Sequence, residues 1–292
     1  MGRSLPHLEV VLEDEQLLAV VKPAGLPTAN AAAGVPSVYT ILRNAAAAGE
    51  FLGVVSRLDA PVSGVLLLAK TRAAAAELSR QFRERRVAKV YSAVVEGRFP
   101  APLAQWVDWH DRIERRDQER RSRLQRGPRA DSRPHARPDS PGTARPTPGE
   151  EGDVRNDMLH DIQDDSGDGR IDEEDGMSCH VRARVVHRAG EVSLIELEPS
   201  TGRRHQLRAQ LAGHGCPIVG DRGYGARLPF LADNRTAIAL HALRLSFEHP
   251  ATGQATTVAA AWPAAWSARF PSLPLGVSPR GRPRGRRPEV DS

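Results

Sequence analysis

Short apolar stretches separated by polar residues dominate the first hundred positions of the chain. Leu8–Leu12 and Leu17–Val21 lie on either side of a polar segment, residues 13–16, and predict two strands joined by a turn. Val65–Ala69 is an uninterrupted apolar run, which is typical of a strand buried in a core. Lys89–Gly97 alternates with a period of two and predicts a further strand. The N-terminal part therefore predicts a sheet.

Two helices are expected between these strands. Residues 37–49 begin at a serine suited to an N-cap and end at a glycine. Thr71–Arg86 places Leu78 and Phe82 four residues apart, so both side chains face the core. Five arginines lie elsewhere on this second helix: Arg72, Arg80, Arg83, Arg85 and Arg86. This cationic face is either simply solvated or a site for phosphate groups, and the pattern leaves both interpretations open.

The C-terminal half repeats the mixture of strands and helices. His180–His187 and Val192–Glu198 predict two strands around a turn at Ala189-Gly190, Arg203–Gly213 predicts a helix, and Ala237–Phe247 predicts another strand. Together with the first half, this order predicts the α+β class: a mixed, largely antiparallel sheet with flanking helices.

The middle of the chain has a different composition. Residues 112–145 are crowded with arginine, proline, serine and glycine, and residues 150–175 with aspartate and glutamate. So little apolar material predicts disorder from Asp111 to Ser178, and we expect the core to fold without this insertion. The insertion is either an arm that attracts nucleic acid or a solvated linker. The predicted segments are residues 1–110 and 179–265 as two parts of one domain, 111–178 as the insertion, and 266–292 as a basic, disordered tail.

One stretch of the insertion resembles a calcium-binding loop. The final position lacks the usual glutamate, no amphipathic helices flank the loop, and chance matches are common in acidic tracts, so we expect no metal site. The oxygen-bearing residues at the matching positions are Asp164, Ser166, Asp168, Asp172 and Asp175.

Composition limits the setting in which the protein works. The formal net charge is +5 over 292 residues, which suits an anionic partner. Only two cysteines are present, so no disulfide framework is implied and a reducing compartment fits. The chain start has no apolar signal-peptide region, and no apolar run is long enough to cross a membrane. We therefore expect a cytoplasmic protein.

The strongest candidate for chemistry is Asp59. It lies in a loop punctuated by Pro61 and Gly64, just before the buried strand, and Arg57 precedes it by two residues. A nearby cation favours the ionised carboxylate. Taken alone, this pattern fits a reactive carboxylate or an aspartate that only stabilises a turn.

Further blocks give this aspartate a context. In this order they resemble the RluA-type RNA pseudouridine synthases, from about Leu8 to about Pro263 with one long interruption. The matching blocks are Lys22–Gly25, Val55–Gly64, Lys89–Ala93, Thr201–Arg208, Pro217–Gly225, Leu240–Ala242 and His249–Gly253.

The resemblance implies a fold, an activity and roles for particular residues. It implies the pseudouridine synthase fold and an isomerase that converts specific uridines of structured rRNA or tRNA to pseudouridine, without a cofactor. Asp59 would be the catalytic carboxylate, Tyr91 would lie against the target base, and Arg208 would pair with Asp59. RNA is the expected partner, and no stable protein partner is implied.

Four further residues are candidates for RNA contact. They are Lys22, Arg57, Arg203 and His205. The alternatives left open are a plain turn at the Lys22 block and a structural role for His205. Asp221 is a second acidic candidate, but its glycine-rich block predicts a structural role.

Two positions depart from the family pattern: Ser56 replaces a histidine, and Val62 replaces a common threonine. They motivate an alternative, a non-catalytic RNA-binding protein that retains the synthase fold. A weaker alternative is a hydrolase that releases uracil.

Overall fold

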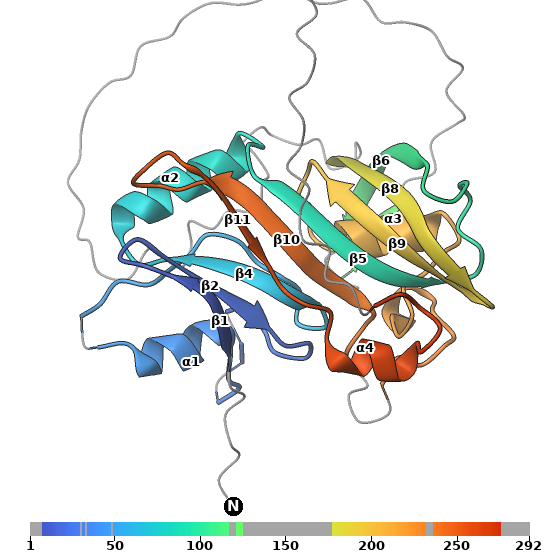
Figure 1. Ribbon diagram of the computed structural model, residues 1–292, viewed down its shortest axis with the longest axis horizontal. Helices are drawn as coiled ribbons and strands as arrows, with labels where there is room; N and C mark the ends of the chain where they lie inside the picture. The colour runs from blue at the N-terminus through green and yellow to red at the C-terminus, as the bar shows by residue number, and fades with distance from the viewer. Residues whose placement is uncertain are drawn as a thin grey trace, which may run out of the picture.

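The computed structural model describes residues 8–29, 31–32, 34–47, 49–116, 121–124, 177–231 and 236–275. They form a mixed sheet with four α-helices and a short 3₁₀ turn (Figure 1). The strands are β1 (Glu9–Glu13), β2 (Leu17–Lys22), β3 (Gly53–Val54), β4 (Ser63–Ala69), β5 (Ala88–Glu96), β6 (Trp106–Arg116), β7 (Arg121–Leu124), β8 (Met177–Ala189), β9 (Val192–Pro199), β10 (Leu240–Glu248) and β11 (Ala255–Ala259). The helices are α1 (Val38–Ala45), α2 (Arg72–Arg83), α3 (Gln206–Gly213) and α4 (Ala264–Arg269), with the 3₁₀ turn at Arg222–Tyr224.

The sheet joins both halves of the sequence. Its strand order is β1-β2-β4-β10-β5-β9-β8-β6-β7, with β3 beside β4 and β11 beside β10. The pairing of β4 with β10 is parallel, and the other pairings between named strands of the described chain are antiparallel. The α+β class with a mixed, largely antiparallel sheet is therefore confirmed.

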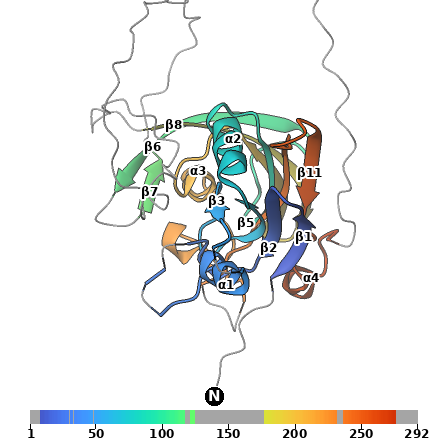
Figure 2. The same ribbon diagram turned by 90° about the vertical axis from the view of Figure 1, so that its left-hand side faces the viewer.

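Helices pack on both halves of this sheet. Helix α2 contacts β3 and β4, whereas α3 contacts β6 and β7. In Figure 2, α2 and α3 lie between the β6–β7 edge and the β1–β2 edge of the sheet. The sequence-predicted cap of the first helix is confirmed, because the Ser37 side chain accepts a hydrogen bond from the Thr40 amide at 3.1 Å. No helix in the described part of the chain is long and apolar enough to span a membrane.

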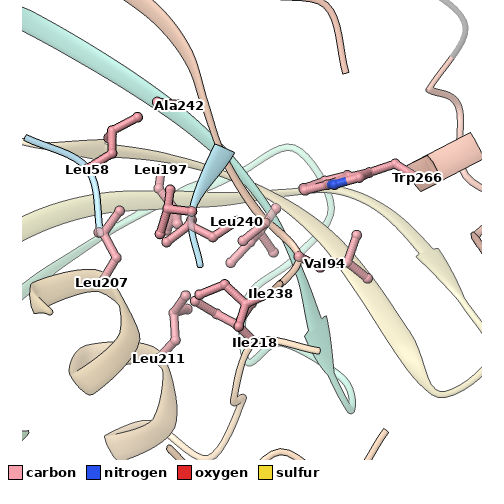
Figure 3. Packing of buried hydrophobic residues seen from close by; sticks show 14 of the residues in the cluster. Leu58, Val94, Leu197, Leu207, Leu211, Ile218, Ile238, Leu240, Ala242 and Trp266 are labelled. Carbon is pink, nitrogen blue, oxygen red and sulfur yellow. The ribbon is translucent and has the colours of Figure 1, made fainter. Parts of the chain in front are cut away.

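The central strands are buried on both faces, as the apolar run of β4 predicts. Leu66 and Leu68 of β4 belong to one hydrophobic cluster, while Val65 and Leu67 belong to a second. Alternate residues of a strand point to opposite faces, so β4 contributes to two cores at once. Figure 3 shows the first cluster, in which strand residues meet side chains from α3 and from loops; its labelled members include Leu58, Leu197, Leu207, Leu211 and Leu240.

The close approach of β4 and β10 depends on Gly64. Gly64 pairs with Ala242 and has a φ of 122°. A Cβ atom at this position would lie 2.5 Å from the Ala242 amide nitrogen and closer still to its carbonyl oxygen. Glycine therefore lets the two strands meet directly after the Asp59 loop.

The predicted insertion begins later than Asp111. Strand β6 continues through Arg116, and β7, at residues 121–124, pairs with it. Ile113 is fully buried against Cys179 and Ala209, and the Asp111 carboxylate accepts a hydrogen bond from Gln210 at 2.7 Å. The prediction of disorder was thus wrong for residues 111–116, 121–124 and 177–178, because β6 pairs with both β7 and β8 and Ile113 packs with Cys179 and Ala209. The rest of the insertion, including the calcium-like loop, lies outside the described residues.

The C-terminal tail also begins later than predicted. Trp266 and Phe270 are 1% and 4% exposed, and both pack in the first hydrophobic cluster through α4. They lie four residues apart, so they share one helical face. The prediction of disorder from residue 266 was therefore wrong up to Leu275, and residues 276–292 lie outside the described part.

Candidate active site

A pocket with a volume of about 310 Å³ joins the residues that the sequence singled out. Its walls come from the Asp59 loop, α2, β5, β10 and the segment that enters α3. Asp59, Tyr91 and Arg208, which come from distant parts of the chain, all line it. The candidate catalytic residues therefore share one cavity.

The loop that carries Asp59 is fixed on both sides of the carboxylate. The buried Thr28 hydroxyl donates to the Leu58 carbonyl at 2.9 Å and accepts from the Leu58 amide at 3.1 Å. On the other side, the Gly25 amide donates to the Ala60 carbonyl at 2.7 Å. The Asp59 side chain is 27% exposed, so its carboxylate reaches the pocket while its backbone is held.

Arg208 lies between two carboxylates. Its Nη1 donates to Asp59 Oδ2 at 3.2 Å, while Nε and Nη2 donate to Asp221 Oδ2 at 2.7 Å and Oδ1 at 3.0 Å. Burial opposes its charge, but the hydrogen bonds and charge of Asp221, followed by those of Asp59, raise the pKa of Arg208 above its ordinary value. The guanidinium is thus a permanent cation in a fixed orientation.

Asp221, the second acidic candidate from the sequence, is buried beside Arg208. It is 2% exposed and forms the two-bond side of the Arg208 contact. Its glycine-rich surroundings predicted a structural block. The sequence offered only an acidic residue in a glycine-rich block. The partner of this residue, Arg208, could not be inferred from spacing.

His205 contacts the same carboxylate from another side. Its Nε2 lies 3.6 Å from Asp59 Oδ2, and its Nδ1 lies 2.9 Å from the Tyr224 hydroxyl. His205 has a φ of 54°, in the left-handed region that a non-glycine residue seldom adopts. Burial and the charges of Arg208 and Arg204 lower the pKa of His205, against the opposing effect of Asp59, which favours the neutral imidazole.

Tyr224 was not identified from the sequence as a candidate site residue. Besides its contact with His205, its ring lies 4.8 Å from the Arg208 guanidinium carbon. A cation over an aromatic face is attracted by the ring quadrupole. Tyr224 therefore supports both residues that approach Asp59.

Tyr91 belongs to the wall formed by β5. It pairs with Leu197 of β9 and Ala242 of β10 in the centre of the sheet. Burial and the negative charge of Asp59 both raise the pKa of the Tyr91 phenol. The pocket therefore presents a neutral aromatic side chain near the carboxylate.

Lys22 does not make the RNA contact predicted for it. It is fully buried, and its Nζ donates to the carbonyls of Pro23 at 3.0 Å, Leu26 at 2.6 Å and Ala60 at 3.0 Å. Burial lowers the pKa of Lys22 to about 7, with Asp59 acting in the opposite direction. The turn interpretation of its block holds instead, because the ammonium group ties that turn to the residue after Asp59.

The remaining cations lie on the pocket wall. Arg57 is exposed there, Arg203 is half-buried with its Nε 3.4 Å from the Ser178 carbonyl, and Lys89 Nζ donates to the Thr201 carbonyl at 3.1 Å. In the part of the chain that the structure describes, no cluster of three or more histidine, cysteine or acidic side chains is arranged to hold a metal.

Known proteins similar to this chain are RNA pseudouridine synthases. A family model described as RNA pseudouridylate synthase matches residues 16–213. The tRNA pseudouridine synthase C of Yersinia pestis is 28% identical over 269 residues, covering 89% of this chain and 88% of the relative. The ribosomal large subunit pseudouridine synthase C of Escherichia coli K12 is 28% identical, covering 87% of this chain and 69% of the relative.

Solved structures show the same fold. Human RNA Pseudouridylate Synthase Domain Containing 4 superposes with a TM-score of 0.62 at 22% identity, covering 90% of this chain and 91% of that chain. Human RNA Pseudouridylate Synthase Domain Containing 1 superposes with a TM-score of 0.58 at 23% identity, covering 89% of this chain and 85% of that chain. The family match spans most of the described chain and includes Asp59, Tyr91 and Arg208. This chain belongs to the RNA pseudouridylate synthase family.

Proposed function

We propose that this protein isomerises uridine to pseudouridine in RNA, with Asp59 as the reactive carboxylate. The reaction breaks the N1–C1′ bond of uridine and joins C1′ to C5, so no atom is gained or lost. The observation that carries the proposal is the ion-paired Asp59 in the pocket with Tyr91 and Arg208.

The contacts of Asp59 suit this chemistry. Asp59 acts either as a nucleophile at C1′ or as a base at C2′. Arg208 supplies a charge-assisted hydrogen bond to its carboxylate. Because Asp221 holds the guanidinium by two further hydrogen bonds, Arg208 stabilises Asp59 without reorienting during the reaction.

Tyr91 is assigned the role of a wall for the extruded base. RNA-binding proteins hold unstacked bases on aromatic rings, and the raised pKa keeps this phenol neutral against the uracil. Extruding a base costs a few kcal/mol, and attraction between the basic rim of the pocket and RNA phosphates offsets part of that cost. Arg57 and Arg203 are placed to provide that attraction.

His205 is assigned to positioning Asp59, in place of direct RNA binding. If Nδ1 accepts the Tyr224 hydroxyl proton, Nε2 carries a proton and points it toward the Asp59 carboxylate. The opposite tautomer would place a bare nitrogen lone pair against a negative oxygen. The tautomer with the proton on Nε2 therefore suits both contacts, because the Tyr224 hydroxyl can donate to Nδ1 while Nε2–H is attracted to Asp59.

The relatives are named for tRNA and for large-subunit rRNA, so both are candidate substrates here. The test is pseudouridine formation by the purified protein on transcripts of each RNA, measured by mass spectrometry of nucleosides. We expect product on at least one RNA from the wild type and none from Asp59→Asn.

Two results would contradict the proposal. Equal product from Asp59→Asn and the wild type would remove Asp59 from the chemistry. RNA binding by the wild type without product on any transcript would support the non-catalytic alternative, and release of free uracil would indicate a hydrolase.

A further inference from the structure

The pocket wall includes residues beyond those that contact Asp59. Tyr91, His205 and Arg208 line it, and so do three residues of α2, namely Ser79, Phe82 and Arg83. Val65 and Leu245 also belong to the lining. Phe82, Val65 and Leu245 belong to the second hydrophobic cluster, whereas Tyr91 packs against the first. The cavity is therefore lined by residues from two hydrophobic clusters.

The three α2 residues form one surface of the helix. Their spacing of three and four residues places Ser79, Phe82 and Arg83 side by side along a single face. Phe82 is only partly buried, so part of its ring remains accessible from the pocket. This face combines an apolar ring, a hydroxyl group and a guanidinium.

The arginines on α2 and directly after it differ in their ion pairing: in the described part of the chain Arg80 and Arg86 are paired, whereas Arg83 is not. Arg80 pairs with Glu77 at 2.8 Å and with Glu84 at 3.2 Å, and Arg86 pairs with Glu84 at 3.2 Å. Arg83 is exposed and, within the residues that the structure describes, has no ion-pair partner.

Arg57, on the same pocket, likewise has none among those residues. Arg83 and Arg57 thus both place an unmatched positive charge on the pocket wall.

We propose that Ser79, Phe82 and Arg83 form a subsite for a nucleotide next to the target uridine, with Arg83 on its phosphate and Phe82 against its sugar or base. This inference rests on the proposed action on RNA and adds where the flanking strand runs. Arginine is suited to phosphate oxygens, and an aromatic face accepts any base without reading sequence. The strand would leave the Asp59 site toward α2.

The test measures binding of a fluorescein-labelled short oligouridylate by anisotropy across a series of salt concentrations. Each phosphate neutralised on a single strand contributes about 0.7 to the slope of log affinity against log salt. We expect Arg83→Ala to lower that slope by about 0.7. We also expect it to weaken binding at low salt by about three- to fivefold, as for an exposed ion pair. Arg83→Lys keeps the charge and should keep the slope.

Arg80→Ala is the matched control, because Arg80 lies on the same helix but is paired and does not line the pocket. It should leave the slope unchanged. Phe82→Leu should weaken binding without changing the slope, since it removes stacking and no charge. Circular dichroism melts of all variants check that α2 remains folded.

Equal slopes for Arg83→Ala, Arg80→Ala and the wild type would overturn the subsite. The proposed function fails separately, through the absence of pseudouridine from the wild type. A protein that makes pseudouridine but ignores Arg83 would therefore refute only the subsite, and one that binds through Arg83 without product would refute only the catalytic assignment.

Discussion

Arg208 is the residue on which the geometry of the site depends most directly. A lysine at this position would keep a positive charge but could not bridge Asp59 and Asp221 with a planar fork of donors. We expect Arg208→Lys to lower kcat by about a hundredfold, the size typical of a small misplacement of a reacting group. Single-turnover kinetics on the identified RNA substrate measure this effect.

A stability measurement tests the contact of Arg208 with Asp221 separately from its contact with Asp59. Arg208→Met would leave the buried Asp221 carboxylate without its cation, which costs about 3–5 kcal/mol. The double variant Arg208→Met/Asp221→Leu should recover much of that loss in urea unfolding while remaining inactive. A full loss of stability in the double variant would contradict the burial argument.

His205 and Tyr224 provide a test of the tautomer argument. In His205→Gln the side-chain amide nitrogen takes the place of His205 Nε2, so its N–H still approaches Asp59. The side chain of His205→Asn is shorter and does not reach Asp59. We expect kcat to fall by up to about fivefold in Tyr224→Phe and His205→Asn, as for a weak charge contact, and less in His205→Gln.

An unchanged KM would show that RNA binding is not involved. Similar kcat values for the glutamine and asparagine variants, or a change confined to KM, would contradict a positioning role.

Lys22 predicts a particular dependence of stability on pH. Its pKa is about 7 in the folded protein and 10.5 unperturbed, so between these values the unfolded chain binds more protons. The free energy of unfolding contributed by this residue therefore rises with pH from about 7 to about 10.5 and is lowest below pH 7.

Lys22→Met should remove this rise and lower stability overall, because three carbonyls lose their donor. Urea titrations of both proteins across that range measure the difference. If the free energies of unfolding of the wild type and Lys22→Met changed with pH in parallel, the three carbonyls would be keeping the pKa of Lys22 at its ordinary value.

Short sequence blocks identify residues whose chemistry is local and fail where the partner is remote. Asp59, Tyr91 and Arg208 were recognised from such blocks, and the structure brings them to one pocket. Tyr224 was not, and Asp221 was recognised only as a candidate with a structural role, because spacing cannot show the contacts of these two residues with Arg208 and His205.

Lys22 was assigned to RNA for the same reason. Lys22 contacts Ala60, which lies 38 residues away in the sequence, and only the fold brings the two together.

At the level of elements, the junction of β4 and β10 is the most sensitive point. Gly64→Ala would force a methyl group into the Ala242 backbone and a left-handed φ onto alanine. We expect it to lower stability by several kcal/mol, in the range of overpacked cores, and to displace the Asp59 loop that precedes β4.

Gly97→Ala is the control for this prediction, since Gly97 also has a positive φ, of 77°, but nothing lies within 4 Å of its Cβ position. It should cost only about 1 kcal/mol. Urea unfolding and pseudouridine formation of both variants distinguish a clash from backbone strain. Equal losses in the two variants would contradict the role given to the β4–β10 contact.

Elements were predictable where a repeating pattern sets them, and their pairing was not. The alternation of β5, the apolar run of β4 and the cap of α1 are all signals within one short segment. The parallel contact of β4 with β10 joins residues nearly 180 positions apart, and no local pattern encodes it. Helix α4 was missed although Trp266 and Phe270 carry its spacing, because a basic, proline-rich sequence follows and dominated the composition.

At the level of the whole molecule, the chain leaves and re-enters the sheet at one place. Leu124 of β7 and Met177 of β8 both pair with Ile113 of β6, from its two sides. Two strand spacings put these residues about 10 Å apart, which a short glycine-serine linker can bridge. Residues 125–176 are highly charged and poor in apolar side chains, so they have little to contribute to a core.

Two deletions therefore have different expected outcomes. Replacing residues 125–176 by such a linker should leave the thermal midpoint nearly unchanged. Removing residues 111–178 should lower it clearly, because Ile113 leaves the core and Gln210 and His214 of the α3 region lose the Asp111 carboxylate. Calorimetry of the two proteins measures the contrast.

The larger deletion should also reduce activity, because β6 and β7 pack against α3 and that helix carries Arg208. Loss of β7 would remove Leu124. Its side chain packs directly against Gly213 at the end of α3, so closely that a Cβ atom on Gly213 would lie 2.5 Å from Leu124 Cδ2. Without this support α3 can shift, and the pairing of Arg208 with Asp59 weakens. If the larger deletion kept wild-type turnover per folded molecule, the support of the active site by this edge of the sheet would be refuted.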